Sequence, residues 1–120
     1  MHMHGLPKDV DLSLFIRREV IQVCIGCHQA QLNFDGRVRV SIEGEAAHRN
    51  PSNVTSTYSE LRQMAEMLVG LLGKCVVEAT RLEPGTLVLS FDSGDVIEIY
   101  DSSEHYESYQ IIHGDKWIVV

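Results

Sequence analysis

The sequence predicts an α+β domain in which a mostly antiparallel sheet, curled or in two layers, carries one amphipathic helix. Residues 31–43 and 87–99 each alternate apolar and polar side chains around a short turn, as β-hairpins do. Between them, residues 57–72 repeat apolar side chains every three or four positions, as one face of a helix does. Because the second hairpin resembles the first, we expect two related meander units with the helix between them.

The length of the chain indicates one domain, since 120 residues can enclose a single hydrophobic core. We expect residues 1–10 to form a disordered N-terminal segment and residues 11–120 to form the domain. Asp11 can cap a short helical turn over residues 12–16.

Both hairpins are expected to have three-residue loops, at residues 35–37 and 92–94. A two-residue loop at Asp35-Gly36 would turn the valines of the following strand to the wrong face of the sheet. The expected cross-strand pairs are Phe34 with Val38, Leu32 with Val40, Leu89 with Ile97, and Leu87 with Ile99.

The helix is expected to begin at a capping box formed by Thr57 and Glu60 and to end near Gly73. The preceding residues, 44–56, are rich in turn formers and predict the longest loop of the chain. After the second hairpin, residues 105–112 predict a strand. Residues 117–120 predict a last strand whose apolar end pairs inside the sheet.

The charge balance argues against nucleic acid as a partner. The net charge is −7, from 17 acidic and 10 basic side chains, and this charge repels phosphate backbones. No apolar run is long enough to cross a bilayer, and the N-terminus lacks the pattern of a secretory signal. We therefore expect a cytoplasmic protein without membrane contact, whose three cysteines are reduced thiols.

The segment Cys24-Ile25-Gly26-Cys27-His28 has the CxxCH spacing that attaches c-type haem. A haem site needs export and a second axial ligand, and the sequence offers neither. A zinc site could use Cys24, Cys27, His28 and Cys75, but a second CxxC-type pair is missing. A redox pair would need a helix N-terminus to lower the thiol pKa. In a strand, Cys24 and Cys27 would face opposite sides, one of them in the core, so we expect no metal and no cofactor.

The sequence contains no catalytic constellation, and we do not expect an enzyme. The acidic residues Asp92, Asp95, Asp101 and Glu104 lack the spacing of a calcium loop and are interpreted as turn and surface residues. His105 could act as a base, but no nucleophile has a position near it that the sequence reveals.

The best candidates for a binding site lie near the C-terminal end. Tyr106 and Tyr109 point to opposite faces of the predicted strand, so one of them should be exposed. An exposed aromatic residue beside carboxylates is common in protein contacts. The candidate binding residues are Tyr106, Glu107, Tyr109, Asp101 and Glu104.

Two segments together resemble a family of small bacterial domains of unknown function. The residues that carry the resemblance are Val23-Cys24-Ile25-Gly26 with Gln29, Gln31, Leu32 and Phe34, then Leu87 to Phe91, Gly94, Ile97, Ile99, Tyr100-Asp101, Ser103 and Tyr106-Glu107-Ser108-Tyr109. Some similar proteins are encoded beside toxin genes and are interpreted as immunity proteins. The resemblance implies a β-rich domain without catalytic residues, in whose relatives other residues replace Cys27 and His28.

These observations lead to three functional hypotheses. The first is a non-catalytic protein-binding module, such as an immunity protein whose acidic face blocks a basic toxin. The second is a small metal- or ligand-binding domain that uses Cys24, Cys27 and His28. The third is a structural module that forms a homodimer through the edge strand at residues 117–120.

Overall fold

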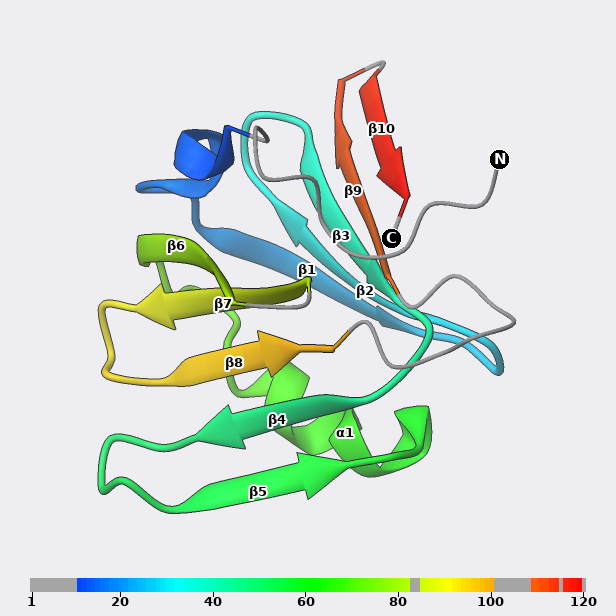
Figure 1. Ribbon diagram of the computed structural model, residues 1–120, viewed down its shortest axis with the longest axis vertical. Coiled ribbons are helices and arrows are strands. Elements are labelled where there is room, and N and C mark those ends of the chain that lie inside the picture. The colour runs from blue at the N-terminus through cyan, green and yellow to red at the C-terminus, as the bar shows by residue number, and fades with distance from the viewer. Residues whose placement is uncertain (1–10, 83–84, 101–108, 115, 120) are drawn as a thin grey trace.

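The computed structural model describes residues 11–82, 85–100, 109–114 and 116–119 (Figure 1). The predicted N-terminal segment 1–10 and the predicted binding residues between positions 101 and 108 lie outside this description. The described part of the chain contains a 3₁₀ turn η1 (Leu12–Phe15), one α-helix α1 (Leu61–Val69) and ten strands.

The strands form two antiparallel sheets of five strands each within the described residues. The first sheet has the order β1 (Val20–Ile25), β2 (Ala30–Phe34), β3 (Val38–Ile42), β9 (Tyr109–His113) and β10 (Lys116–Val119). The second has the order β5 (Thr55–Tyr58), β4 (Ala46–Arg49), β8 (Val96–Ile99), β7 (Thr86–Phe91) and β6 (Val76–Leu82). The predicted fold class, α+β with a two-layer antiparallel sheet, is confirmed.

Each sheet combines one meander with a hairpin from the other half of the chain. The hairpin β4–β5 follows β3 in sequence but pairs with β8. Reciprocally, the hairpin β9–β10 follows β8 but pairs with β3 (Figure 1). The two halves are therefore interlocked, and neither sheet can be completed without the other.

The two meanders have the same register, as the sequence predicted. Phe34 pairs with Val38 in the first, and Leu89 pairs with Ile97 in the second. Both meanders also contain a β-bulge at the same place. Between β1 and β2 the register shifts after the pair Val20–Phe34, and between β6 and β7 it shifts after the pair Val76–Phe91. A bulge shared at equivalent positions supports the relationship between the units.

An approximate twofold axis relates the halves and passes near an antiparallel bridge between Glu19 and Cys75. Backbone hydrogen bonds across it come in equivalent pairs. In the first pair, the Val20 N–H donates to the Lys74 carbonyl (3.0 Å) and the Val76 N–H donates to the Arg18 carbonyl (2.9 Å). In the second pair, the Arg17 N–H donates to the Val76 carbonyl (2.8 Å) and the Gly73 N–H donates to the Val20 carbonyl (2.8 Å). The bridge joins the two sheets along their β1 and β6 edges.

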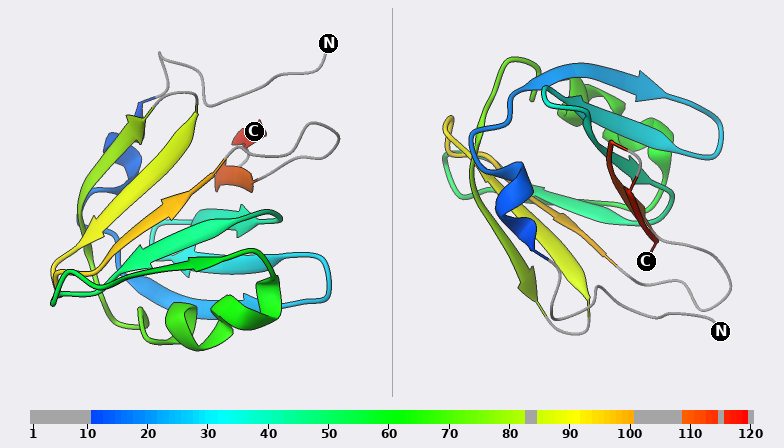
Figure 2. Two further views of the ribbon diagram at one scale, coloured as in Figure 1. Left: turned by 60° about the horizontal axis from the view of Figure 1, so that its bottom comes forward. Right: turned by 90° about the horizontal axis from the view of Figure 1, so that it is seen from above.

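The core lies between the sheets, where alternate strand residues face inward. Leu32 and Val40 from the first sheet and Leu89 and Ile97 from the second are at most 1% exposed. Helix α1 packs Met64 and Leu68 into this core and crosses one end of the space between the sheets (Figure 2). Its opposite side is exposed, as expected for an amphipathic helix.

Three predictions about this middle region and the C-terminus were wrong. The helix covers Leu61–Val69 rather than residues 57–72, and Thr57 lies in β5 instead of capping the helix. The predicted loop 44–56 contains β4 and the start of β5, because Ala46 and Ala47 are buried against neighbouring strands. Strand β10 lies at the edge of its sheet and is not paired on both sides. The short turn capped by Asp11, whose carboxylate accepts from Ser13 N–H at 3.0 Å, was predicted correctly.

Candidate functional site

A buried carboxylate, Asp95, lies at the end of the β7–β8 turn and gathers polar side chains from three parts of the chain. His48 of β4 places Nε2 2.7 Å from Asp95 Oδ1. The hydroxyl of Ser93 donates to Asp95 Oδ2. The Lys74 ammonium, between α1 and β6, lies 3.7 Å from the same oxygen. The side chains of Asp95 and His48 are only 12% and 17% exposed, so the pair is largely removed from solvent.

The surroundings keep Asp95 ionised. Burial by itself raises the pKa of this carboxyl. Hydrogen bonds from Ser93 and His48, together with the positive charges of His48 and Lys74, outweigh burial and hold the pKa below its usual value. The carboxylate therefore depends on its partners, and removal of any one of them changes its energy.

The related half of the molecule has a valine where Asp95 stands. Phe34 and Phe91 each precede a three-residue loop, and the first residues after these loops are Val38 and Asp95. The Phe91 N–H donates to the Asp95 carbonyl at 2.8 Å, as expected for this paired position. Val38 is 1% exposed and Asp95 is 8% exposed. The fold thus buries this position in both halves.

His48 in turn occupies the position of an isoleucine in the related half. Val40 pairs with Ile111 across β3 and β9, and its counterpart Ile97 pairs with His48 across β8 and β4. Ile111 is 1% exposed. One half therefore buries an aliphatic pair at the site where the other half buries a hydrogen-bonded histidine and aspartate.

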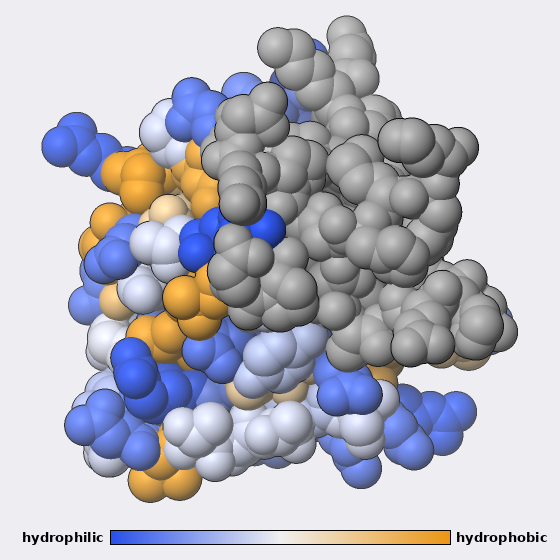
Figure 3. Space-filling view, in the orientation of Figure 1, coloured by the Kyte–Doolittle hydropathy of each residue, from blue (hydrophilic) through white to orange (hydrophobic). Residues whose placement is uncertain are grey.

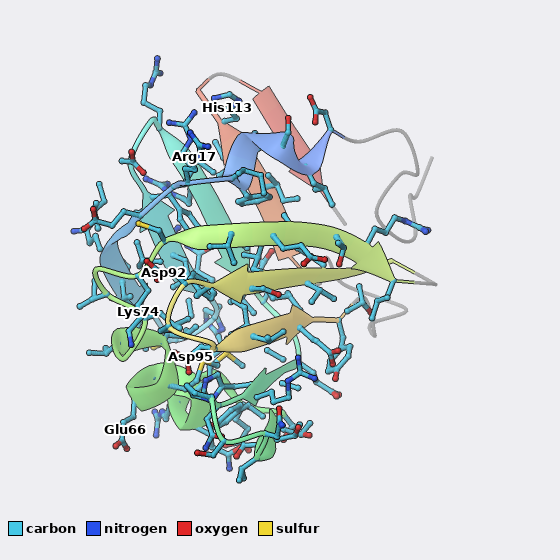
Figure 4. The ribbon with its side chains drawn as sticks, turned by 90° about the vertical axis from the view of Figure 1, so that its left-hand side faces the viewer. Arg17, Glu66, Lys74, Asp92, Asp95 and His113 are labelled. Atoms are coloured by element: carbon cyan, nitrogen blue, oxygen red, sulfur yellow. The ribbon has the colours of Figure 1, made fainter. Side chains whose placement is uncertain are left out.

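The polar pair borders a groove of about 700 Å³ between α1, β4 and the β7–β8 turn. The groove is lined by His48, Pro51, Tyr58, Gln63, Glu66, Met67, Gly70, Leu71, Lys74, Ser93 and Asp95. The lining combines apolar side chains with the positive charge of Lys74 and the negative charges of Glu66 and Asp95. Lys74, Asp95 and Glu66 follow one another down the same side of the molecule (Figure 4). Such a groove can hold a ligand that is itself part apolar and part polar.

The arrangement differs from a nucleophilic triad. In a triad the histidine lies between the serine and the carboxylate and takes the serine proton. Here the carboxylate lies in the middle, and Ser93 and His48 both bind to it. The Ser93 hydroxyl is thus directed to an acceptor that would not activate it as a nucleophile. The geometry is that of a largely buried carboxylate bound by two side chains.

A family model matches residues 12–120 of the chain, which include both meanders, α1 and the groove. The chain belongs to DUF6188, a family of unknown function. No curated protein and no solved structure matches the DUF6188 chain. Its one described helix, α1, is too short to cross a membrane.

Sequence reasoning named Asp95 but placed it among surface residues, and it missed His48. A usable signal was present. Asp95 stands at the head of an alternating series with Ile97 and Ile99, so it had to share their inward face. His48 had no such signal, because β4 was predicted to be loop.

The CxxCH segment straddles the end of β1 and the turn that follows it, so the expectation that both cysteines lie in one strand was wrong. Cys24 is half-buried in β1 and accepts a hydrogen bond from the Asn33 amide at 3.7 Å, whereas Cys27 and His28 are exposed in the turn. Among the residues that the structure describes, no three His, Cys, Asp or Glu side chains are close enough to hold one metal ion.

The predicted binding residues cannot be placed on the groove. Asp101, Glu104, Tyr106 and Glu107 lie outside the described residues, and for Tyr109 only the backbone, at the start of β9, is described. They stay predictions.

Proposed function

We propose that this DUF6188 protein is a non-catalytic protein-binding module that receives a segment of its partner in the groove beside His48 and Asp95. The observation that carries the proposal is the polar pair itself. The aliphatic pair Val38 and Ile111 satisfies the same fold in the related half, so the fold does not require a buried histidine and aspartate. Buried polar groups cost free energy, and their presence at one of two equivalent positions favours a functional reason.

The chemistry of the groove supports a polypeptide segment as the ligand. Lys74 ends 3.7 Å from Asp95, beyond hydrogen-bond distance, so its N–H groups can donate to a carbonyl. Gln63 and Glu66 can accept from backbone N–H groups, and the half-buried Met67 provides apolar contact. An extended segment presents donors, acceptors and apolar side chains in alternation, which matches this lining.

A protein that acts by binding alone would fit several roles. An immunity protein, which neutralises a toxin by covering it, is one of them. The central position of the carboxylate argues against a Ser-His-Asp mechanism, because Ser93 donates to Asp95 and not to His48.

The test uses the double variant His48→Ile/Asp95→Val, which copies the aliphatic pair of the other half. We expect its free energy of unfolding to stay within about 2 kcal/mol of the wild type, because hydrophobic replacement of a buried ion pair is often neutral. The wild type and the variant each carry an affinity tag. Each is co-expressed with the proteins encoded by the genes next to its own gene. The wild type should retain one such product, and the variant should lose it at least tenfold.

A matched control is Thr80→Val/Ser90→Val, which makes the same kind of change on the outer face of β6 and β7, away from the groove. It should retain the partner like the wild type. Equal retention by all three proteins, or no retained product with the wild type, would contradict the proposal.

A further inference from the structure

A second surface of the molecule, separate from the groove, surrounds the approximate twofold axis. The bulge residues Ile21 and Val77 occupy equivalent positions and are 57% and 56% exposed. Ile16 and Leu72, also equivalent, are 37% and 43% exposed. We call these four aliphatic residues, together with the carboxylates of Glu19, Asp35 and Asp92, the axis surface. Apolar residues do reach the surface over η1 and β6 (Figure 3).

Backbone hydrogen bonds hold the aliphatic residues of the axis surface together. The Arg17 N–H binds the Val76 carbonyl, which brings Ile16 and Val77 into the same neighbourhood. The equivalent bond from Gly73 to Val20 does the same for Leu72 and Ile21. Because these bonds belong to the frame that joins the two sheets, the apolar residues are presented on rigid backbone.

The carboxylates of the axis surface are also fixed. One oxygen of Asp35 accepts the Glu19 N–H at 2.7 Å, and one oxygen of Asp92 accepts the Cys75 N–H at 3.1 Å. Among the described residues, no hydrogen bond reaches the second oxygen of either carboxylate. The described carboxylates are too dispersed to hold one metal ion. Their charge is therefore suited to several separate cationic groups.

Three carboxylates, those of Glu19, Asp35 and Asp92, lie close to Cys75 at the centre of this surface. The half-buried Cys75 thiol has a raised pKa, first because of burial and then because of the charges of Asp92, Glu19 and Asp35. Arg17 lies on the same side of the molecule (Figure 4). Lys74 lines the groove, with its ammonium 3.7 Å from Asp95 Oδ2. The net charge of −7 adds a long-range attraction for cations.

We propose that the axis surface docks a basic protein partner, through Lys or Arg side chains on Glu19, Asp35 and Asp92 near its centre and through aliphatic contact on either side. A second copy of this chain fits less well, because it would bring the same three carboxylates against these. Exposed aliphatic residues surrounded by charge are a common form of protein interface. The inference extends the proposed function, since it names the chemistry of a protein partner, but it concerns a different surface.

The experiment selects random linear peptides displayed on phage against the wild-type protein. Enriched peptides should carry Lys or Arg around aliphatic or aromatic residues, and their affinity should fall as salt is raised. Bound peptide should slow alkylation of Cys75 by iodoacetamide at least fivefold and leave the exposed Cys27 unaffected.

Two variants separate this surface from the groove. Asp35→Asn/Asp92→Asn removes two charges, and each amide oxygen can still accept the backbone N–H, so the fold should be retained. It should weaken peptide binding at least tenfold. The control Glu45→Gln/Glu60→Gln removes two charges from exposed residues elsewhere and should not weaken binding. The groove variant His48→Ile/Asp95→Val should also bind these peptides normally, so failure of the groove proposal would leave this result intact.

Several outcomes would overturn the inference. They are the absence of enriched peptides, enrichment of acidic or uncharged peptides, and unchanged affinity of Asp35→Asn/Asp92→Asn. Self-association detected by light scattering that Ile21→Ser/Val77→Ser abolishes would assign the surface to a second copy instead.

Discussion

The two halves of this molecule share a meander, a bulge and a register, yet they treat one buried position differently. The first half fills it with Val38 and Ile111, and the second with Asp95 and His48. Both halves fold within the same chain and the same solvent, so each serves as a reference for the other. The polar pair therefore stands at positions that the same strand arrangement fills with aliphatic residues in the other half.

The largest expected effect comes from placing a carboxylate in the wrong half. Val38→Asp buries a carboxylate without the hydrogen bonds that Ser93 and His48 make with Asp95, and the residue opposite it, His113, is exposed. We expect a loss of at least about 3 kcal/mol in the free energy of unfolding, because a buried charge without partners is strongly destabilising. Denaturant titration followed by circular dichroism measures it.

The control for this prediction is Val38→Ala, which removes packing but adds no charge and should cost about 1–2.5 kcal/mol. If Val38→Asp were as stable as Val38→Ala, the first half would tolerate the carboxylate. The partners of Asp95 would then not be needed to bury a charge at this position.

An intermediate effect is expected from acid. The pKa of Asp95 is lowered in the folded protein, so the folded state binds fewer protons than the unfolded state as the pH falls. The stability that the carboxylate contributes is therefore complete above about pH 5 and is lost as the pH falls through the lowered pKa. Asp95→Asn, which cannot ionise, should differ most from the wild type near pH 7 and least near pH 3. A constant difference across this range would show that the ionised form contributes nothing.

The smallest effect concerns the backbone at the axis. Gly73 has φ of +81°, and its counterpart Arg17 has φ of +68°, a left-handed conformation that costs a side chain about 1 kcal/mol. Arg17→Gly should therefore stabilise the protein by about 0.5–1 kcal/mol, and Gly73→Ala should destabilise it by about 1 kcal/mol. A Cβ on Gly73 would have no atom within 4 Å, so the second change tests conformation alone. Destabilisation by Arg17→Gly, or stabilisation by Gly73→Ala, in thermal unfolding would contradict the equivalence of the two residues.

Local sequence patterns predicted the parts of this fold whose partners are close in the chain. The registers of both hairpins followed from loop length and from the alternation of apolar residues such as Leu32 and Val40. The helix was found from its apolar spacing, but its start was displaced, because Thr57 is used as a strand residue opposite Ala47. A β-branched residue before a helix fits both a cap and a strand, and only the neighbouring strand decides between them.

The candidate site depended on contacts that no local pattern contains. Two related meanders and one helix between them could be predicted from the sequence, because alternation and turn chemistry act over a few residues. The interpretation of Asp95 as a surface residue was wrong, since it shares the inward face of Ile97 and Ile99. The pairing of β4 with β8 and of β9 with β3 became visible in the three-dimensional structure, and this exchange brings His48 to Asp95. Pairing between distant strands is selected by the packing of the whole core, and the short-range spacing of residues does not predict it.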